Sequence, residues 1–148
     1  IGVLDKGHVV ERERKTLLDS YSNSAGANMD KAVDEAMGGI LFIDEAYSIT
    51  ENDHSDSYGR ECLTELTKAL EDYRDDLVVI VAGYTEPMNH FFASNPGLKS
   101  RFTTTIDFED YSIDQLLEIL TLQCAKYGYC LTELAKEKAR ERRLCQER

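Results

Sequence analysis

Two adjacent carboxylates, Asp44 and Glu45, come directly after four apolar residues, Ile40 to Ile43. A short apolar run between turn signals predicts a strand that is buried on both faces, as in a parallel sheet covered by helices. Ligands of open α/β sheets bind beyond the carboxyl ends of the strands, so this strand would deliver both acids to the ligand edge. Two carboxylates side by side repel each other unless a cation or a hydrogen-bonding group offsets their charge.

A Mg²⁺ ion beside a phosphate group would supply that cation, because Mg²⁺ prefers hard oxygen ligands. One carboxylate could then hold the metal through water, while its neighbour polarises an attacking water molecule. Two alternatives remain: the acids are solvated loop residues, or Asp44 caps a following helix. We favour the phosphate site, since a hydrophobic strand that ends in Asp-Glu is a common feature of such sites.

The same rule directs attention to two further places in the chain. Tyr84 and Thr85 follow a second apolar run, Leu77 to Ala82, and a loop surrounds Arg101. Thr85 has an ordinary alternative as a turn residue, because Thr is common in turns. Arg101, taken alone, reads most simply as an exposed surface arginine.

The elements that must position these residues alternate between strands and helices. In chain order we expect a strand at His8–Glu11, a loop at Asp19–Asn28, a helix at Met29–Met37 ended by Gly38 and Gly39, a strand at Ile40–Ile43, a helix at Ser57–Tyr73, a strand at Leu77–Ala82, a short helix at Pro87–Ala93, a strand at Thr103–Phe108, a helix from Ile113 with a capping box of Ser112 and Gln115, a break at Gly128 and a helix after Thr132. This alternation predicts an α/β fold with a mainly parallel sheet.

Composition narrows the classes of function. The chain has 148 residues and a formal charge of −11, which disfavours non-specific binding to nucleic acid or to an anionic membrane. No apolar run reaches the about 20 residues that cross a bilayer. The four cysteines lack C-x-x-C spacing, which argues against zinc and favours reduced cytosolic thiols. The three histidines lie far apart, so no Ser-His-Asp or Cys-His site is readable.

Longer segments around the acidic residues resemble the AAA+ ATPases. Residues 38–47 (GGILFIDEAY) are similar to the Walker B segment of that family. Residues 75–84 (DDLVVIVAGY), 94–102 (SNPGLKSRF) and 107–111 (DFEDY) point, in the right order, to the branch that contains CbbX, the red-type Rubisco activase, and stage V sporulation protein K. The resemblance runs from about residue 3 to residue 130.

The resemblance implies a role for five residues. Asp44 would assist in coordinating Mg²⁺ through water, and Glu45 would orient and activate the hydrolytic water. Arg101 matches the arginine finger, which reaches the γ-phosphate bound by a neighbouring subunit of a ring. Thr85 occupies the place of a polar sensor that binds the attacking water or the γ-phosphate. Tyr21 matches the aromatic residue of the first pore loop, although the glycines that usually flank it are absent.

The resemblance also implies an organisation and partners. Residues 1–110 correspond to an incomplete large, nucleotide-binding subdomain, and residues 111–148 to the start of the helical small subdomain. The chain has no G-x-x-x-x-G-K-[ST] loop and does not begin with Met, so we expect a piece of a longer protein: a partial P-loop NTPase with a three-layer fold that lacks its first, central strand. The full-length form would be a cytoplasmic ATP hydrolase that uses ATP and Mg²⁺, assembles into a homo-oligomeric ring, expected to be a hexamer, and remodels a protein partner.

Two other functions are compatible with the sequence. The chain could be a catalytically inactive AAA+ remnant that serves as a protein-interaction module. It could also be an unrelated flavodoxin-like domain that uses Asp44 and Glu45 as an acid–base pair. Without a phosphate-binding loop, the chain alone is expected to bind ATP weakly or not at all.

Overall fold

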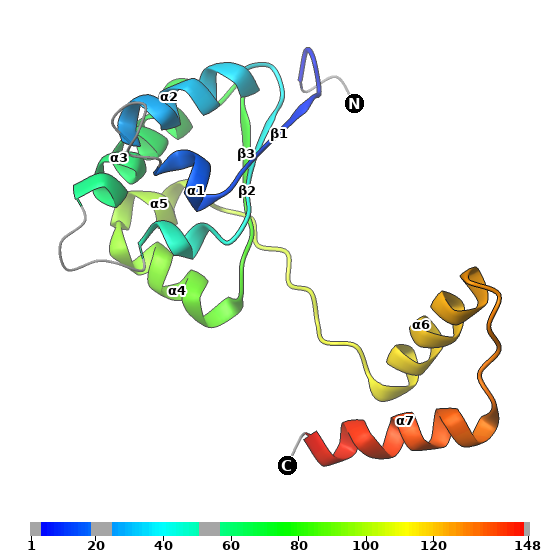
Figure 1. Cartoon of the computed structure of the whole chain (residues 1–148). Coiled ribbons are helices and arrows are strands. Elements are labelled where there is room, and N and C mark those ends of the chain that lie inside the picture. The colour runs from blue at the N-terminus through cyan, green and yellow to red at the C-terminus, as the bar shows by residue number, and fades with distance from the viewer. Residues whose placement is uncertain (1–3, 19–24, 51–56, 147–148) are drawn as a thin grey trace. The chain divides into compact units, whose positions relative to one another are not determined.

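A three-stranded parallel sheet organises the amino-terminal part of the chain (Figure 1). The computed structural model describes residues 4–18, 25–50 and 57–146. The strands are β1 (Val9–Arg12), β2 (Ile40–Ile43) and β3 (Val78–Val81), and they lie in the order β1-β2-β3 with every pair parallel. The α/β class and the parallel sheet are therefore confirmed.

The helices of the chain fall into two compact units that divide between Thr105 and Ile106. The first unit contains the sheet, the 3-10 helix η1 (Ala46–Ile49) and the helices α1 (Arg14–Leu17), α2 (Ala25–Ala36), α3 (Ser57–Asp72), α4 (Thr85–Ser94) and α5 (Pro96–Arg101). The second contains α6 (Ile113–Lys126) and α7 (Glu133–Gln146). The predicted loop at 19–28 is wrong in its last part, because α2 already begins at Ala25, where small residues pack against the core.

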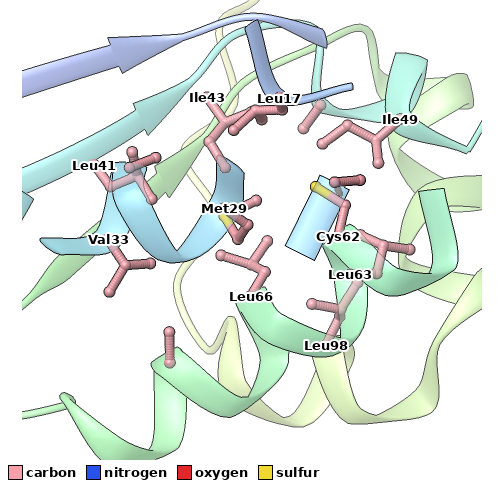
Figure 2. Packing of buried hydrophobic residues seen from close by; sticks show 14 of the residues in the cluster. Leu17, Met29, Val33, Leu41, Ile43, Ile49, Cys62, Leu63, Leu66 and Leu98 are labelled. Atoms are coloured by element: carbon pink, nitrogen blue, oxygen red, sulfur yellow. The ribbon is translucent and has the colours of Figure 1, made fainter. Parts of the chain in front are cut away.

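The core of the first unit lies between one face of the sheet and its helices. Leu41 and Ile43 of β2 are fully buried, and Figure 2 shows them with Met29 of α2 and Leu66 of α3 in the same cluster. Leu98 of α5 closes the cluster at another side. The period-2 alternation of a strand sends every second residue to this face, so the core specifies the register of β2.

The opposite face of the sheet is less well covered. Val78 and Ile80 of β3 are 37% and 43% exposed, and in the aligned register Ile80 lies beside Phe42 of β2. The prediction that residues 77–82 are buried on both faces is therefore wrong. The reason is that the helices α1 to α5 all lie on one face of the sheet, which leaves the other face uncovered by these helices (Figure 1). In the described part of the sheet, β3 is also an edge strand. Two of the three expected layers are described.

The predicted strand at Thr103–Phe108 is also wrong, since residues 102–112 are neither helical nor paired in a sheet. Ile106 and Phe108 are 75% and 93% exposed. Their β-branched and aromatic character favours a strand only where a neighbouring strand and a buried face are available. Among the described strands, none pairs with this segment.

The second unit begins with the predicted capping box. The Ser112 hydroxyl accepts a hydrogen bond from the Gln115 N–H at 3.3 Å, and the Ser112 N–H donates to Gln115 Oε1 at 2.8 Å. The helix α6 ends before Gly128, whose φ of 79° places it in the left-handed region that glycine tolerates. Arg140 of α7 forms an ion pair with Asp114 of α6, which links the two helices. Of the helices described, none is long and apolar enough to cross a membrane.

Candidate functional site

Asp44 and Glu45, hereafter the acidic pair, follow β2 at its carboxyl end and are both exposed. The Asp44 N–H donates to the carbonyl of Arg12 at 3.1 Å, which extends the β1–β2 ladder by one residue. The Glu45 N–H donates to Asp44 Oδ1 at 2.9 Å. The ladder and this local bond hold the acidic pair at the edge of the sheet where ligands of α/β folds bind.

Glu45 has an unusual backbone conformation. Its φ of 47° and ψ of 45° are left-handed, and within residues 4–18, 25–50 and 57–146 it alone combines a side chain with a positive φ. A left-handed residue with a Cβ costs about 1–2 kcal/mol relative to its right-handed form. Such strain clusters at functional sites, where the surrounding structure enforces it. The left-handed conformation of Glu45 turns the chain sharply from the end of β2 into η1.

Two backbone hydrogen bonds tie this turn to the end of β3. The Ala82 N–H donates to the Ile43 carbonyl at 2.9 Å, and the Ala46 N–H donates to the Ala82 carbonyl at 3.1 Å. The ring of Tyr47 then packs directly on Gly83, where a Cβ would lie 2.7 Å from Tyr47 Cδ1. The segments that follow β2 and β3 therefore form one connected edge.

Thr85 belongs to this edge. It is the first residue of α4, it is exposed, and Tyr84 precedes it as the N-cap. The Tyr84 ring lies 6.5 Å from the ring of Tyr47, centroid to centroid. The structure thus brings the segment of Thr85 beside the segment of the acidic pair, as the sheet rule predicts for residues after neighbouring parallel strands.

Arg101 has its contacts elsewhere. It is the last residue of α5, its side chain is 28% exposed, its Nη1 donates to the Gly97 carbonyl at 3.0 Å, and its Nη2 forms a charged hydrogen bond with Glu71. Glu71 lies in the last turn of α3, the helix that leads into the amino end of β3. The guanidinium is therefore bound to α3 and α5 of its own chain rather than to the acidic pair.

Several of these contacts could not be predicted from the sequence. Glu71 and Arg101 are 30 residues apart, and no motif connects them. The left-handed turn at Glu45 has no glycine or asparagine to signal it. The small residue Gly83 after an apolar run is the one signal of a close approach, since glycine accommodates a neighbouring ring.

Tyr21, the expected pore-loop aromatic, lies outside the described residues. Cys62 is fully buried, and burial, with a smaller contribution from the Glu61 charge, raises the pKa of its thiol to about 12, so this thiol is neutral at physiological pH.

The oxygen ligands of the acidic pair fit a Mg²⁺ ion that is also bound by water and by phosphate. Carboxylate oxygens and water are the ligands that Mg²⁺ takes in proteins, together with the phosphates of a bound nucleotide. In the part of the chain that the structure describes, no group of three or more His, Cys, Asp or Glu side chains could hold a metal. With two carboxylates, the acidic pair suits a metal whose other ligands are water and phosphate.

Three comparisons with known proteins point in one direction. The chain is 42% identical over 136 residues to the protein CfxQ homolog of Trieres chinensis, covering 92% of this chain and 47% of that relative. It is 40% identical over 141 residues to stage V sporulation protein K of Bacillus subtilis (95% and 44%), and 40% identical over 136 residues to protein CbbX of Cereibacter sphaeroides (92% and 44%). The chain spans less than half the length of these relatives, and the branch indicated by its motifs is confirmed.

The family model agrees with the relatives. The model described as "ATPase family associated with various cellular activities (AAA)" matches residues 5–110, which include β1 to β3, the acidic pair, Thr85 and Arg101. With the parallel sheet and the polar residues at its carboxyl edge, this match identifies the chain as a member of the AAA family.

Proposed function

We propose that this chain supplies the water-activating and metal-binding half of an ATP site in an AAA+ ATPase that works as a homo-oligomeric ring. The observation that carries the proposal is the position of the acidic pair on a strained turn that is bonded to the end of β3. The phosphate-binding loop would come from sequence outside these 148 residues. Its strand would pair along the edge of β3 that has no partner among the described strands.

The roles of the residues follow from their chemistry. When bound, Mg²⁺ supplies positive charge that offsets the phosphates and the acidic pair. Asp44 would hold a water of that ion with its carboxylate, and Glu45 would accept a proton from the attacking water as a general base. Thr85 has a hydroxyl that can donate to the γ-phosphate or accept from the attacking water.

Arg101 would act on a neighbouring subunit. Its bonds to Glu71 and Gly97 keep it with α3 and α5 of its own chain, which supports a role in trans rather than toward its own acidic pair. A positive guanidinium at the γ-phosphate stabilises the charge that develops as the phosphoryl group is transferred. A finger that acts on the neighbouring subunit requires a ring of subunits. The energy of hydrolysis would be used to remodel a protein partner in the cytoplasm. Tyr21 would contact that partner.

The test uses a chimera in which residues 1–148 replace the matching segment of stage V sporulation protein K of Bacillus subtilis, hereafter the chimera. Phosphate release from Mg-ATP is measured for the chimera and for Glu45→Gln. We expect Glu45→Gln to lower the turnover by about 10²–10⁴-fold, the range of a lost general base, while ATP still binds. Glu86→Gln, an equal change of charge at the start of α4, is the matched control and should leave turnover unchanged.

Two results would contradict the proposal. Turnover of Glu45→Gln at the level of the control would remove the general-base role. A chimera that assembles and binds ATP but hydrolyses none would instead favour the inactive interaction module.

A further inference from the structure

The guanidinium of Arg101 is fixed at two points by groups of its own chain. Nη1 donates to the Gly97 carbonyl at 3.0 Å, within the same helix, and Nη2 is bound by the carboxylate of Glu71 on α3. We propose that Glu71 is a positioning residue: it orients the Arg101 guanidinium toward the γ-phosphate of the neighbouring subunit. This inference rests on the proposed role of Arg101 in trans.

The contact between Glu71 and Arg101 is poorly suited to a purely stabilising role. Glu71 is 64% exposed, and ion pairs of exposed side chains add little to the free energy of folding. What such a contact does achieve is geometric. A long arginine side chain has many rotamers, and two fixed hydrogen bonds reduce them to one direction.

The helix that carries Arg101 is itself seated on α3. The Asn95 side chain accepts from the Gly97 N–H at 2.9 Å and donates to Thr67 Oγ1 of α3 at 3.5 Å. Gly97 also allows the guanidinium to fold back along the helix, because a Cβ there would lie 3.2 Å from Arg101 Nη1 and 3.1 Å from Thr67 Cγ2. Glu71, one turn further along α3 than Thr67, then holds the end of the side chain.

The guanidinium can hold these bonds and still bind a phosphate. It has five N–H donors in a planar fork, and the bonds to Gly97 and Glu71 use one donor on each terminal nitrogen. A group that is already oriented avoids reorganisation at the moment of reaction, so its contribution appears in the transition state. ATP itself is bound by the other subunit, and loss of the orientation should lower kcat while KM for ATP stays nearly constant.

The experiment measures kcat and KM of the chimera with substitutions at Glu71. We expect Glu71→Ala to lower kcat by about ten- to hundred-fold, as misplacement of a catalytic group does, with KM for ATP changed by less than about twofold. Glu71→Gln keeps an oxygen that accepts from Nη2 and should recover most of the lost kcat. Glu65→Ala is the matched control, because Glu65 lies on the same helix and pairs with Lys68 instead of α5, so its kcat should be unchanged.

A mixing experiment separates orientation in trans from a defect of the subunit itself. Glu45→Gln subunits lack the proposed base but keep Glu71 and Arg101. Added to Glu71→Ala subunits, they should raise the activity per Glu71→Ala subunit several-fold, because intact fingers then face working sites. A merely structural defect of Glu71→Ala would give no such rise and would overturn the inference.

The other outcomes are equally decisive. An unchanged kcat for Glu71→Ala overturns the positioning role, and so does an increased kcat, which would mean that Glu71 restrains the finger. Arg101→Ala tells the two proposals apart: full turnover of this variant removes the finger itself and with it the basis of the inference. A loss of about 10³-fold or more in Arg101→Ala beside a normal Glu71→Ala leaves the proposed function standing and removes only the role of Glu71.

Discussion

The backbone N–H of Ala46 donates a hydrogen bond to the carbonyl of Ala82 at 3.1 Å, which joins the turn after β2 to the turn after β3. The acidic pair precedes the donor, and Thr85 follows the acceptor by three residues. Because both turns share this bond, a change in the position of one is passed to the other. The proposed base and the proposed sensor therefore belong to one hydrogen-bonded edge.

The left-handed turn at Glu45 makes a prediction about stability. Glycine adopts a positive φ without the steric cost of a Cβ, so Glu45→Gly should raise the free energy of unfolding of the 148-residue chain by about 0.5–1 kcal/mol. The same variant should abolish hydrolysis in the chimera, because the carboxylate is gone. Urea unfolding followed by circular dichroism measures the first effect.

Glu86→Gly is the control for this substitution. Glu86 lies in the first turn of α4, where glycine is a poor helix former, and its replacement should lower stability by up to about 1 kcal/mol. Equal losses for the two variants would show that the backbone at Glu45 is not strained.

The contact between Tyr47 and Gly83 predicts a penalty for any side chain at position 83. A Cβ there would lie 2.7 Å from Tyr47 Cδ1 and 2.9 Å from Met88 Sδ. Gly83→Ala should lower the free energy of unfolding by about 1–3 kcal/mol, as overpacking does. The loss should be smaller when Gly83→Ala is made in a Tyr47→Ala background, which a double-mutant cycle by urea unfolding would reveal. Additive effects of the two substitutions would speak against the contact.

Burial of Cys62 predicts a loss of stability at alkaline pH. The folded thiol has a pKa of about 12, raised from 9.0 by burial and by Glu61, whereas the unfolded thiol ionises near its ordinary value. Between these two values the unfolded chain binds fewer protons than the folded chain, so the free energy of unfolding falls as pH rises. The contribution is fully present below pH 9.0 and should decline above it by up to about 1.4 kcal/mol per pH unit.

The measurement compares slopes rather than absolute stabilities. Urea unfolding at pH 8, 9 and 10 should show a shallower decline for Cys62→Ala than for the parent chain, and an unchanged decline for Cys130→Ala, whose side chain is exposed. Parallel curves for the Cys62→Ala variant and the parent would mean that the buried thiol ionises freely.

The exposed segment between the two units predicts a site of proteolysis. Residues 102–112 have no helix or strand, and both Phe108 and Tyr111 expose most of their side chains. Chymotrypsin at low concentration should cut there first and release a fragment close to residues 1–108, because proteases cut extended, exposed backbone. Mass spectrometry identifies the cut, and Phe108→Ala with Tyr111→Ala should slow it. First cuts inside α3 or α6 would contradict the division into two units.

The local elements of this chain follow from short-range rules. The apolar run at Ile40–Ile43 forms β2 with the expected bounds, the capping box at Ser112 starts α6, and Gly38 ends the turn after α2 with a positive φ. These features depend on residues only a few positions away in the chain, so the sequence is enough to predict them. The placement of Asp44 and Glu45 after a strand is of the same kind, and so is the family, because its motifs are contiguous segments.

Burial and pairing depended on segments that are distant in the chain. Residues 103–108 have the composition of a strand but pair with none of the described strands, and β3 is apolar on both faces although one of them is open. The bonds of Ala46 to Ala82 and of Arg101 to Glu71 join residues 36 and 30 positions apart, so no local pattern encodes them. Residue types and spacing led to a hypothesis about which chemistry the edge of the sheet performs. Only the folding of the chain into three dimensions decided which groups hold the acidic pair and the arginine in place, because such contacts form when distant segments pack together.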